Sequence, residues 1–225
     1  LVLAPLEAAA GRAATRWRAL DAHYPLTGES RGLHAAAHGL AVEDTLDDLR
    51  EGDGSQRIRL MATASTVTSD KKLRHDKLLA YWVAHLLVNA NAVAATTCIV
   101  APDALVQLPP LDAAEAKHHL DALLAAVAEG MRAPLPIARK TAFAWLLTEA
   151  ANQGLPPEKQ KNPYANARKR YDHDEGEHGH GEVDEEPALA RTWPDFAAMH
   201  GAGFERWLHL YRPLLDAARV LDDAA

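Results

Sequence analysis

The sequence contains a single cysteine and no long apolar run. Because Cys98 is the only cysteine among 225 residues, no disulfide can form within the chain, and we expect a reducing, cytoplasmic compartment. No stretch reaches the roughly 18 apolar residues that a membrane-spanning helix needs, so we expect no membrane association. The start, Leu1 to Pro5, has neither an initiator methionine nor a basic segment before an apolar one. It therefore predicts no signal peptide and suggests a piece of a longer chain.

The sequence also lacks an excess of positive charge. It has 24 lysine and arginine residues against 31 aspartate and glutamate residues, a net charge of −7. Domains that bind nucleic acid tightly by its backbone are usually basic, because phosphate neutralisation supplies most of their affinity. We therefore do not expect tight DNA binding by this chain alone. A phosphate-binding Gly-x-x-x-x-Gly-Lys-Ser/Thr segment is absent, which excludes ATP binding of that type.

Hydrophobic periodicity predicts a helix followed by strands in the first part of the chain. Apolar residues recur every three or four positions over 2–22, as in an amphipathic helix. Apolar and polar residues alternate along 56–65, which indicates a half-buried strand. The glycine-containing turn at 51–55 joins it to a predicted partner at 41–49, and 33–38 is a third short strand.

The rest of the chain is predicted to be mostly helical. The further predicted elements are a helix at 70–89 capped by Asp70, strands at 94–100 and 105–108, a helix at 112–128, and helical segments at 139–152, 163–171, 187–200 and 203–220. The resulting order, α-β-β-β-α-β, is that of the PD-(D/E)XK nuclease-like core. We therefore expect an α/β (α+β) fold with this core at 1–130 and a helical C-terminal extension at 131–225, packed on the core.

Several motifs resemble one family, the C-terminal domain of RecC, the gamma subunit of exodeoxyribonuclease V. They share aromatic residues and prolines at loop and helix boundaries, and they cover at least 112–215. The motifs are 130–136 (Gly-Met-Arg-Ala-Pro-Leu-Pro) with 140–146, then Ala167-Arg168, Tyr171 and Gly181-Glu182, then 190–194 (Ala-Arg-Thr-Trp-Pro), and finally 204–207 and 210–215.

The resemblance implies a function for this chain without identifying an active site. RecC is part of a helicase–nuclease for DNA repair and recombination, and its C-terminal domain is expected to keep a nuclease-like fold without catalysis. The resemblance further implies that the domain scaffolds the RecB and RecD subunits. It also implies that a hairpin of this region acts as a wedge where the duplex DNA end is parted.

The residues themselves argue against nuclease chemistry. A PD-(D/E)XK site needs an acidic residue on one strand and an Asp/Glu-x-Lys triplet on the next, so that carboxylates bind a divalent cation. The first residue has candidates in the acidic segment 43–48, but 58–65 contains neither a carboxylate nor a lysine. We therefore expect no catalytic residue and interpret 43–48 as a solvated hairpin face. The alternative is an active metal-dependent nuclease whose carboxylate comes from an unusual position.

Histidines and the cysteine offer other candidate sites. His178 and His180 lie in the acidic segment 173–182 and offer zinc or nickel ligands, but the segment is typical of a flexible, solvated loop, and we expect no metal and no cofactor. His85 and Cys98 are interpreted as core residues. The pair His118 and His119, in a predicted helix, is interpreted as one exposed and one packed side chain.

Four basic residues are candidates for contact with DNA: Arg57, Arg59, Lys71 and Lys72. The arginines lie on a predicted hairpin arm and the lysines at the start of a predicted helix, where they would meet phosphate oxygens or an acidic partner. A second basic cluster runs from Lys159 to Arg170. The alternative for both groups is a solvated surface.

Overall fold

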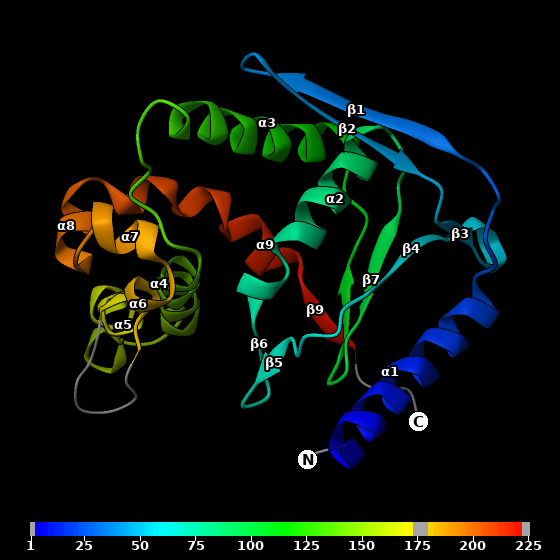
Figure 1. Cartoon of the computed structure of the whole chain (residues 1–225), viewed down its shortest axis with the longest axis horizontal. Coiled ribbons are helices and arrows are strands. Elements are labelled where there is room, and N and C mark those ends of the chain that lie inside the picture. The colour runs from blue at the N-terminus through cyan, green and yellow to red at the C-terminus, as the bar shows by residue number, and fades with distance from the viewer. Residues whose placement is uncertain (1–2, 173–179, 222–225) are drawn as a thin grey trace. The chain divides into compact units, whose positions relative to one another are not determined.

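The computed structural model describes residues 3–172 and 180–221, which divide into two compact units (Figure 1). The first unit comprises 1–128 with 217–225, and the second comprises 129–216. The fold class is mixed α/β, as expected. The sequence predicted one division after residue 130, whereas the first of these compact units also contains the last residues of the chain.

A five-stranded mixed sheet forms the centre of the first unit. Its strand order is β3-β4-β7-β8-β9, and only the β4–β7 pair is parallel. The strands are β3 (Leu49–Glu51), β4 (Arg57–Ala62), β7 (Thr96–Val100), β8 (Leu105–Leu108) and β9 (Arg219–Leu221).

Helices cover both faces of this sheet. Trp17 and Leu20 of α1 (Leu3–His23) pack on the face that carries Ile58 and Cys98. Neighbouring residues of a strand point to opposite faces, and on the opposite face the hydroxyl of Thr97 lies 2.9 Å from Nδ1 of His85 in α2 (Leu79–Ala90). This explains why β7 is buried at all five positions. The remaining long helix of the unit is α3 (Ala113–Gly130).

The predicted strand pairing is wrong in part, because β1 (Arg31–Ala37) and β2 (Leu40–Leu46) form a hairpin of their own. The predicted arm at 41–49 divides into β2, which pairs with β1, and β3, which pairs with β4. His38 and Gly39 have φ values of 56° and 76° and form the two-residue turn between β1 and β2. Two positive φ values match the twist of a hairpin, so the chain reverses here as well as at 51–55.

A second small hairpin replaces the first turns of the helix predicted at 70–89. Asp70 does not cap a helix, because Asp70 and Lys71 have φ values of 49° and 62° and join β5 (Thr68–Ser69) to β6 (Lys72–Leu73). Asp103 holds the base of this hairpin, since its carboxylate accepts hydrogen bonds from the Thr68 amide and hydroxyl at 2.8 and 2.6 Å. A 3-10 turn, η2 (His75–Lys77), then precedes α2.

The second unit is helical. Its elements are α4 (Arg139–Asn152), α5 (Pro163–Tyr171), α6 (Glu182–Glu185), α7 (Pro187–Thr192), α8 (Phe196–Gly201), the 3-10 helix η4 (Phe204–Leu210) and α9 (Arg212–Ala217). Leu146, Tyr171, Phe196 and Phe204 are fully buried in its core. The helix predicted at 187–200 breaks before Pro194, because a residue that precedes proline disfavours helical geometry. The helix predicted at 203–220 is also wrong at its end, where β9 pairs with β8.

A buried carboxylate connects two helices of the second unit. Glu182 of α6 is 2% exposed and accepts hydrogen bonds from the Lys140 and Thr141 amides at 3.0 and 2.8 Å, at the start of α4. It also accepts one from the Thr141 hydroxyl at 2.9 Å. The carboxylate therefore satisfies amides that the first turn of a helix leaves unpaired, and its charge lies at the positive end of the helix dipole.

Replacing Glu182 with glutamine should destabilise the second unit. Every contact made by Glu182 is an accepted hydrogen bond, so the amide nitrogen of glutamine must face a donor. We expect Glu182→Gln to lower the free energy of unfolding by about 2 kcal/mol in urea titrations. Glu185→Gln is the matched control on the same helix. Glu185 pairs with Lys140 while remaining partly exposed, so its loss should cost less than about 1 kcal/mol. Equal losses would contradict this role for Glu182.

Buried histidine should make the first unit sensitive to acid. His85 is completely buried, and burial lowers its pKa from 6.5 to about 4; burial lowers the pKa of His75 to about 4 as well. As the pH falls below 6.5, the imidazole of His85 becomes protonated in the unfolded chain but stays neutral in the folded chain. The contribution of His85 should therefore fall by about 2 kcal/mol between pH 7.5 and pH 5, with no further change above pH 7.5.

Unfolding experiments from pH 7.5 to pH 5 measure this dependence. His85→Gln should flatten the pH profile, whatever its stability at pH 7.5, whereas His23→Gln at an exposed position should leave the profile unchanged. An unaltered profile in His85→Gln would exclude His85 as the source.

Candidate functional site

An ion pair joins the acidic segment 43–48 to β4 at one side of the sheet. Nε of Arg59 on β4 donates to both carboxylate oxygens of Asp48, each at 2.9 Å. The side chains of Arg59 and Asp48 are 10% and 34% exposed. Asp48 precedes β3, and the register places Leu49 opposite Arg59, so backbone pairing brings the two charges together. The guanidinium neutralises the carboxylate that was a candidate cation ligand.

Two other acidic candidates, Glu43 and Asp44, lie on the β1–β2 hairpin. Glu43 lies opposite His34 in the β1–β2 hairpin and Asp44 lies opposite Leu33, so the two carboxylates point to opposite faces. Oδ1 of Asp44 accepts a hydrogen bond from the Thr45 amide at 2.8 Å. Within residues 3–172 and 180–221, no group of three His, Cys, Asp or Glu side chains lies close enough to hold a metal ion. These residues do not fit the divalent cation that the nuclease alternative requires.

The four candidate DNA-contact residues occupy two places in the first unit. Arg57 and Arg59 lie on one face of β4, where Arg57 pairs with Glu51 at 3.0 Å and Arg59 with Asp48. Lys71 and Lys72 lie at the tip of the β5–β6 hairpin and are exposed. In the part of the chain that the structure describes, neither lysine forms an ion pair. Of the four, the two lysines have positive charge that no carboxylate of the described chain neutralises.

Cys98 is a buried thiol, and the two neighbouring histidines of α3 differ in burial. Burial raises the pKa of the Cys98 thiol to about 11, so the thiol is protonated at neutral pH. His119 is half-buried, and burial lowers its pKa although Glu115 opposes the shift. His118 is exposed, and its ring lies 5.6 Å from that of His119. These placements agree with the packing that the sequence suggested for His85, Cys98 and the histidine pair.

The acidic histidine segment is only partly described. Residues 173–179, which include His178, lie outside the described residues. Nδ1 of His180 lies 3.9 Å from a carboxylate oxygen of Asp184. In the second basic cluster, Arg168 pairs with Asp172 and Arg170 with Glu185, so this surface is partly neutralised.

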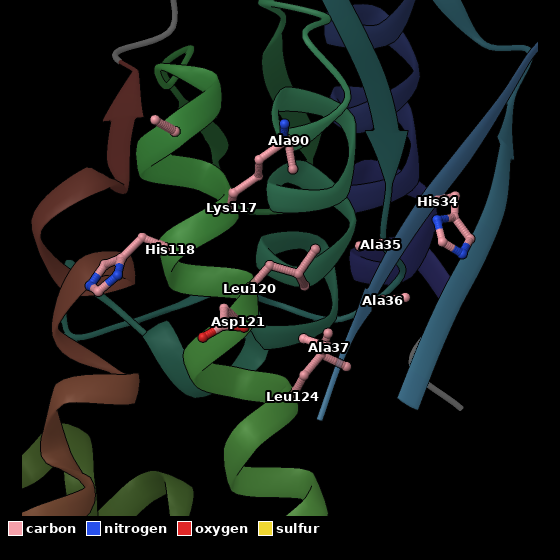
Figure 2. A pocket seen from close by; sticks show the side chains of 11 residues that line it. His34, Ala35, Ala36, Ala37, Ala90, Lys117, His118, Leu120, Asp121 and Leu124 are labelled. Atoms are coloured by element: carbon pink, nitrogen blue, oxygen red, sulfur yellow. The ribbon is translucent and has the colours of Figure 1, made fainter. Parts of the chain in front are cut away.

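A groove that the sequence did not reveal lies between β1 and α3. It has a volume of about 590 Å³, and the end of α2 closes one side at Ala90. Figure 2 shows Leu120 pointing from α3 toward β1, Lys117 reaching toward Ala90, and His118 directed away from the strand. The strand contributes the run of alanines 35–37. That run was visible in the sequence, but its position opposite a helix 80 residues later was not.

Comparison with known protein families identifies one match. The family model described as the RecC C-terminal domain matches residues 1–150, which include nearly all of the first unit and most of α4 in the second. The motifs after residue 150 lie beyond this match. No curated protein matches the chain. In the described residues, no helix is both long and apolar enough to span a bilayer. Because the match covers residues 1–150 of 225, the chain belongs to the RecC C-terminal domain family.

Proposed function

We propose that this chain is a non-catalytic domain of the RecC subunit of the RecBCD helicase–nuclease, exodeoxyribonuclease V. The observation that carries the proposal is the Asp48–Arg59 pair in a member of this family. Hydrolysis of DNA by a nuclease of this type needs a divalent cation held by several hard oxygen ligands. Here the candidate carboxylate is held by a guanidinium, and β4 carries no carboxylate of its own.

The proposed role is to scaffold the RecB and RecD subunits during double-strand break repair and recombination in the cytoplasm. In this proposal, exposed large apolar side chains contribute contacts to the partner subunits, as such residues do in protein interfaces. In the first unit these are Leu26, Val83, Val127 and Val220, and in the second Met131 is 75% exposed. The separate units each present such positions.

The β5–β6 hairpin is the proposed element that approaches the DNA fork. Lys71 lies in the turn and Lys72 beside it, and Asp103 holds the base of the hairpin through Thr68. A rigid base with exposed cations at its tip suits contact with a phosphate backbone. Arg57 and Arg59 suit this role less well, because both form ion pairs within the chain.

An active metal-dependent nuclease remains the alternative function. It would require a cation to displace the guanidinium of Arg59 from Asp48. It would also need a second carboxylate near Asp48, whereas Glu43 and Asp44 lie on the neighbouring hairpin and point to opposite faces. The geometry of the described residues therefore favours the non-catalytic role.

The isolated chain should bind partner subunits without cleaving DNA. We expect a pull-down to retain RecB or RecD, and we expect no cleavage of linear DNA with magnesium or manganese. Arg59→Lys and Asp48→Asn should leave DNA uncleaved, because the described residues form no cation site to be altered. Metal-dependent cleavage that disappears in a folded Asp48→Asn would overturn the proposal and support the alternative. Loss of both partners from the pull-down would overturn the scaffold role.

Removing the two hairpin cations should weaken DNA binding by the assembled complex. In Lys71→Gln/Lys72→Gln, the slope of log K against log salt for a forked duplex should decrease in magnitude by about 2, since two phosphate contacts are lost. The measurement is fluorescence anisotropy across a salt series. Lys159→Gln/Lys161→Gln changes two exposed lysines of the second unit and should leave the slope unchanged. An unchanged slope in the first variant would exclude the hairpin tip from DNA contact.

A further inference from the structure

We infer that the groove between β1 and α3 binds a short, extended, acidic peptide segment of another protein, which adds to the free edge of β1. Addition of a strand to a sheet edge beside a helix is an established mode of peptide recognition. The groove lies entirely within the first unit and is distinct from the Asp48–Arg59 edge and the β5–β6 tip.

The first argument is the state of the β1 edge. The side-chain amide of Asn91 accepts a hydrogen bond from the His34 amide at 3.3 Å and donates one to the His34 carbonyl at 3.2 Å. Asn91 thus contacts His34 as the backbone of a neighbouring strand would. Groups two residues apart point to the same edge of a strand, so the amide and carbonyl of Ala36 face the groove. No described residue pairs with them, and Ala36 is exposed.

The second argument is the lack of charge along this part of β1. Proteins protect free strand edges with charged side chains that discourage pairing. Beyond His34, the residues of β1 at the groove are the alanines 35–37, which carry no charge and leave room for another backbone to approach. The edge that faces α3 is therefore open to pairing.

The third argument is that both ends of the groove are closed. Asn91 occupies the edge at His34, and at the other end Nε2 of His38 lies 3.2 Å from a carboxylate oxygen of Asp121 on α3. The edge between these closures is about 13 Å long, at roughly 3.3 Å per residue, which suits a segment of about four residues. Leu120 and Leu124, one helical turn apart, form the apolar wall beside it.

The fourth argument concerns the charge of the occupant. Lys117 lines the groove and is exposed, and no carboxylate of the described residues pairs with it. Asp121, the acidic residue of the lining, lies at the other end of the groove, beside His38. A partner with a carboxylate near the Asn91 end would pair with Lys117, whereas a basic partner would bring like charges together. Charge complementarity therefore selects an acidic segment.

Peptide binding to the whole chain tests this inference. The probes are two fluorescein-labelled tetrapeptides of alternating valine and threonine, with glutamate at one terminus or the other so that both strand directions are sampled. We expect one of them to bind in fluorescence anisotropy. Ala36→Pro should weaken it at least tenfold, because proline removes the outward amide without removing a bond to β2. Ala36→Ser keeps the amide and should bind within twofold of the wild type.

A second comparison does not depend on how Ala36→Pro folds. The same peptide with alternate backbone nitrogens methylated, so that it cannot donate to β1, should bind at least tenfold more weakly to the wild-type chain. Lys117→Glu should weaken the glutamate peptide at least fivefold and favour a lysine peptide, whereas Lys72→Glu, outside the groove, should do neither.

Several outcomes would overturn the inference. They are equal affinity for the methylated peptide, equal affinity in a folded Ala36→Pro, and no binding of either glutamate peptide at about 1 mM. Concentration-dependent dimerisation in sedimentation that Ala36→Pro abolishes would show that a second copy of this chain occupies the edge. Neither DNA nor a partner subunit is present, so these outcomes are independent of the proposed function.

Discussion

The burial of β7 on both faces is the constraint on which the first unit depends. Five consecutive buried residues cannot lie in a sheet that has one solvated face, so a helix must cover each side. The parallel pairing of β4 with β7 requires a crossover connection, and the segment that contains α2 supplies it. The polar side chains of α2 that are buried against the sheet then need hydrogen-bond partners inside the protein. Asn89 meets this need by bonding the His85 carbonyl at 2.9 Å and the Leu111 amide at 3.2 Å.

Because the centre of the sheet is covered on both faces, its charged side chains lie near the edges. Arg59 lies on β4 beside the short edge strand β3, and its side chain is nearly buried because the covered sheet surrounds it. A buried charge that loses its partner typically costs about 3–5 kcal/mol. The ion pair with Arg59 therefore competes with cation binding by Asp48. A cation could coordinate Asp48 only if Arg59 were left unpaired. The edge resists conversion to a metal site for energetic as well as compositional reasons.

The sequence predicted the elements whose signal is local. The alternation at β4, the β-branched residues of β7 and the periodic apolar residues of α3 all lie within one element, and each was placed correctly. The RecC family was also recognised from motifs, and the match to residues 1–150 confirms it. The predicted helices were wrong where a turn or a strand forms in a segment that has helical propensity. Asp70 has the character of a helix cap, yet with Lys71 it forms a hairpin turn, and β9 forms only because β8 offers an edge.

The candidate sites show the same limit more sharply, because sites depend on pairs of residues that are distant in sequence. Arg59 and Lys71 look alike as cations on polar segments, but only the register of β3 against β4 reveals that Arg59 is paired. In the sequence, the alanines 35–37 do not indicate a binding site, because the groove depends on the position of α3 opposite them. The described residues form no cation site, but the edges of the sheets still offer surfaces for binding, and β1 leaves the Ala36 amide and carbonyl unpaired beside α3.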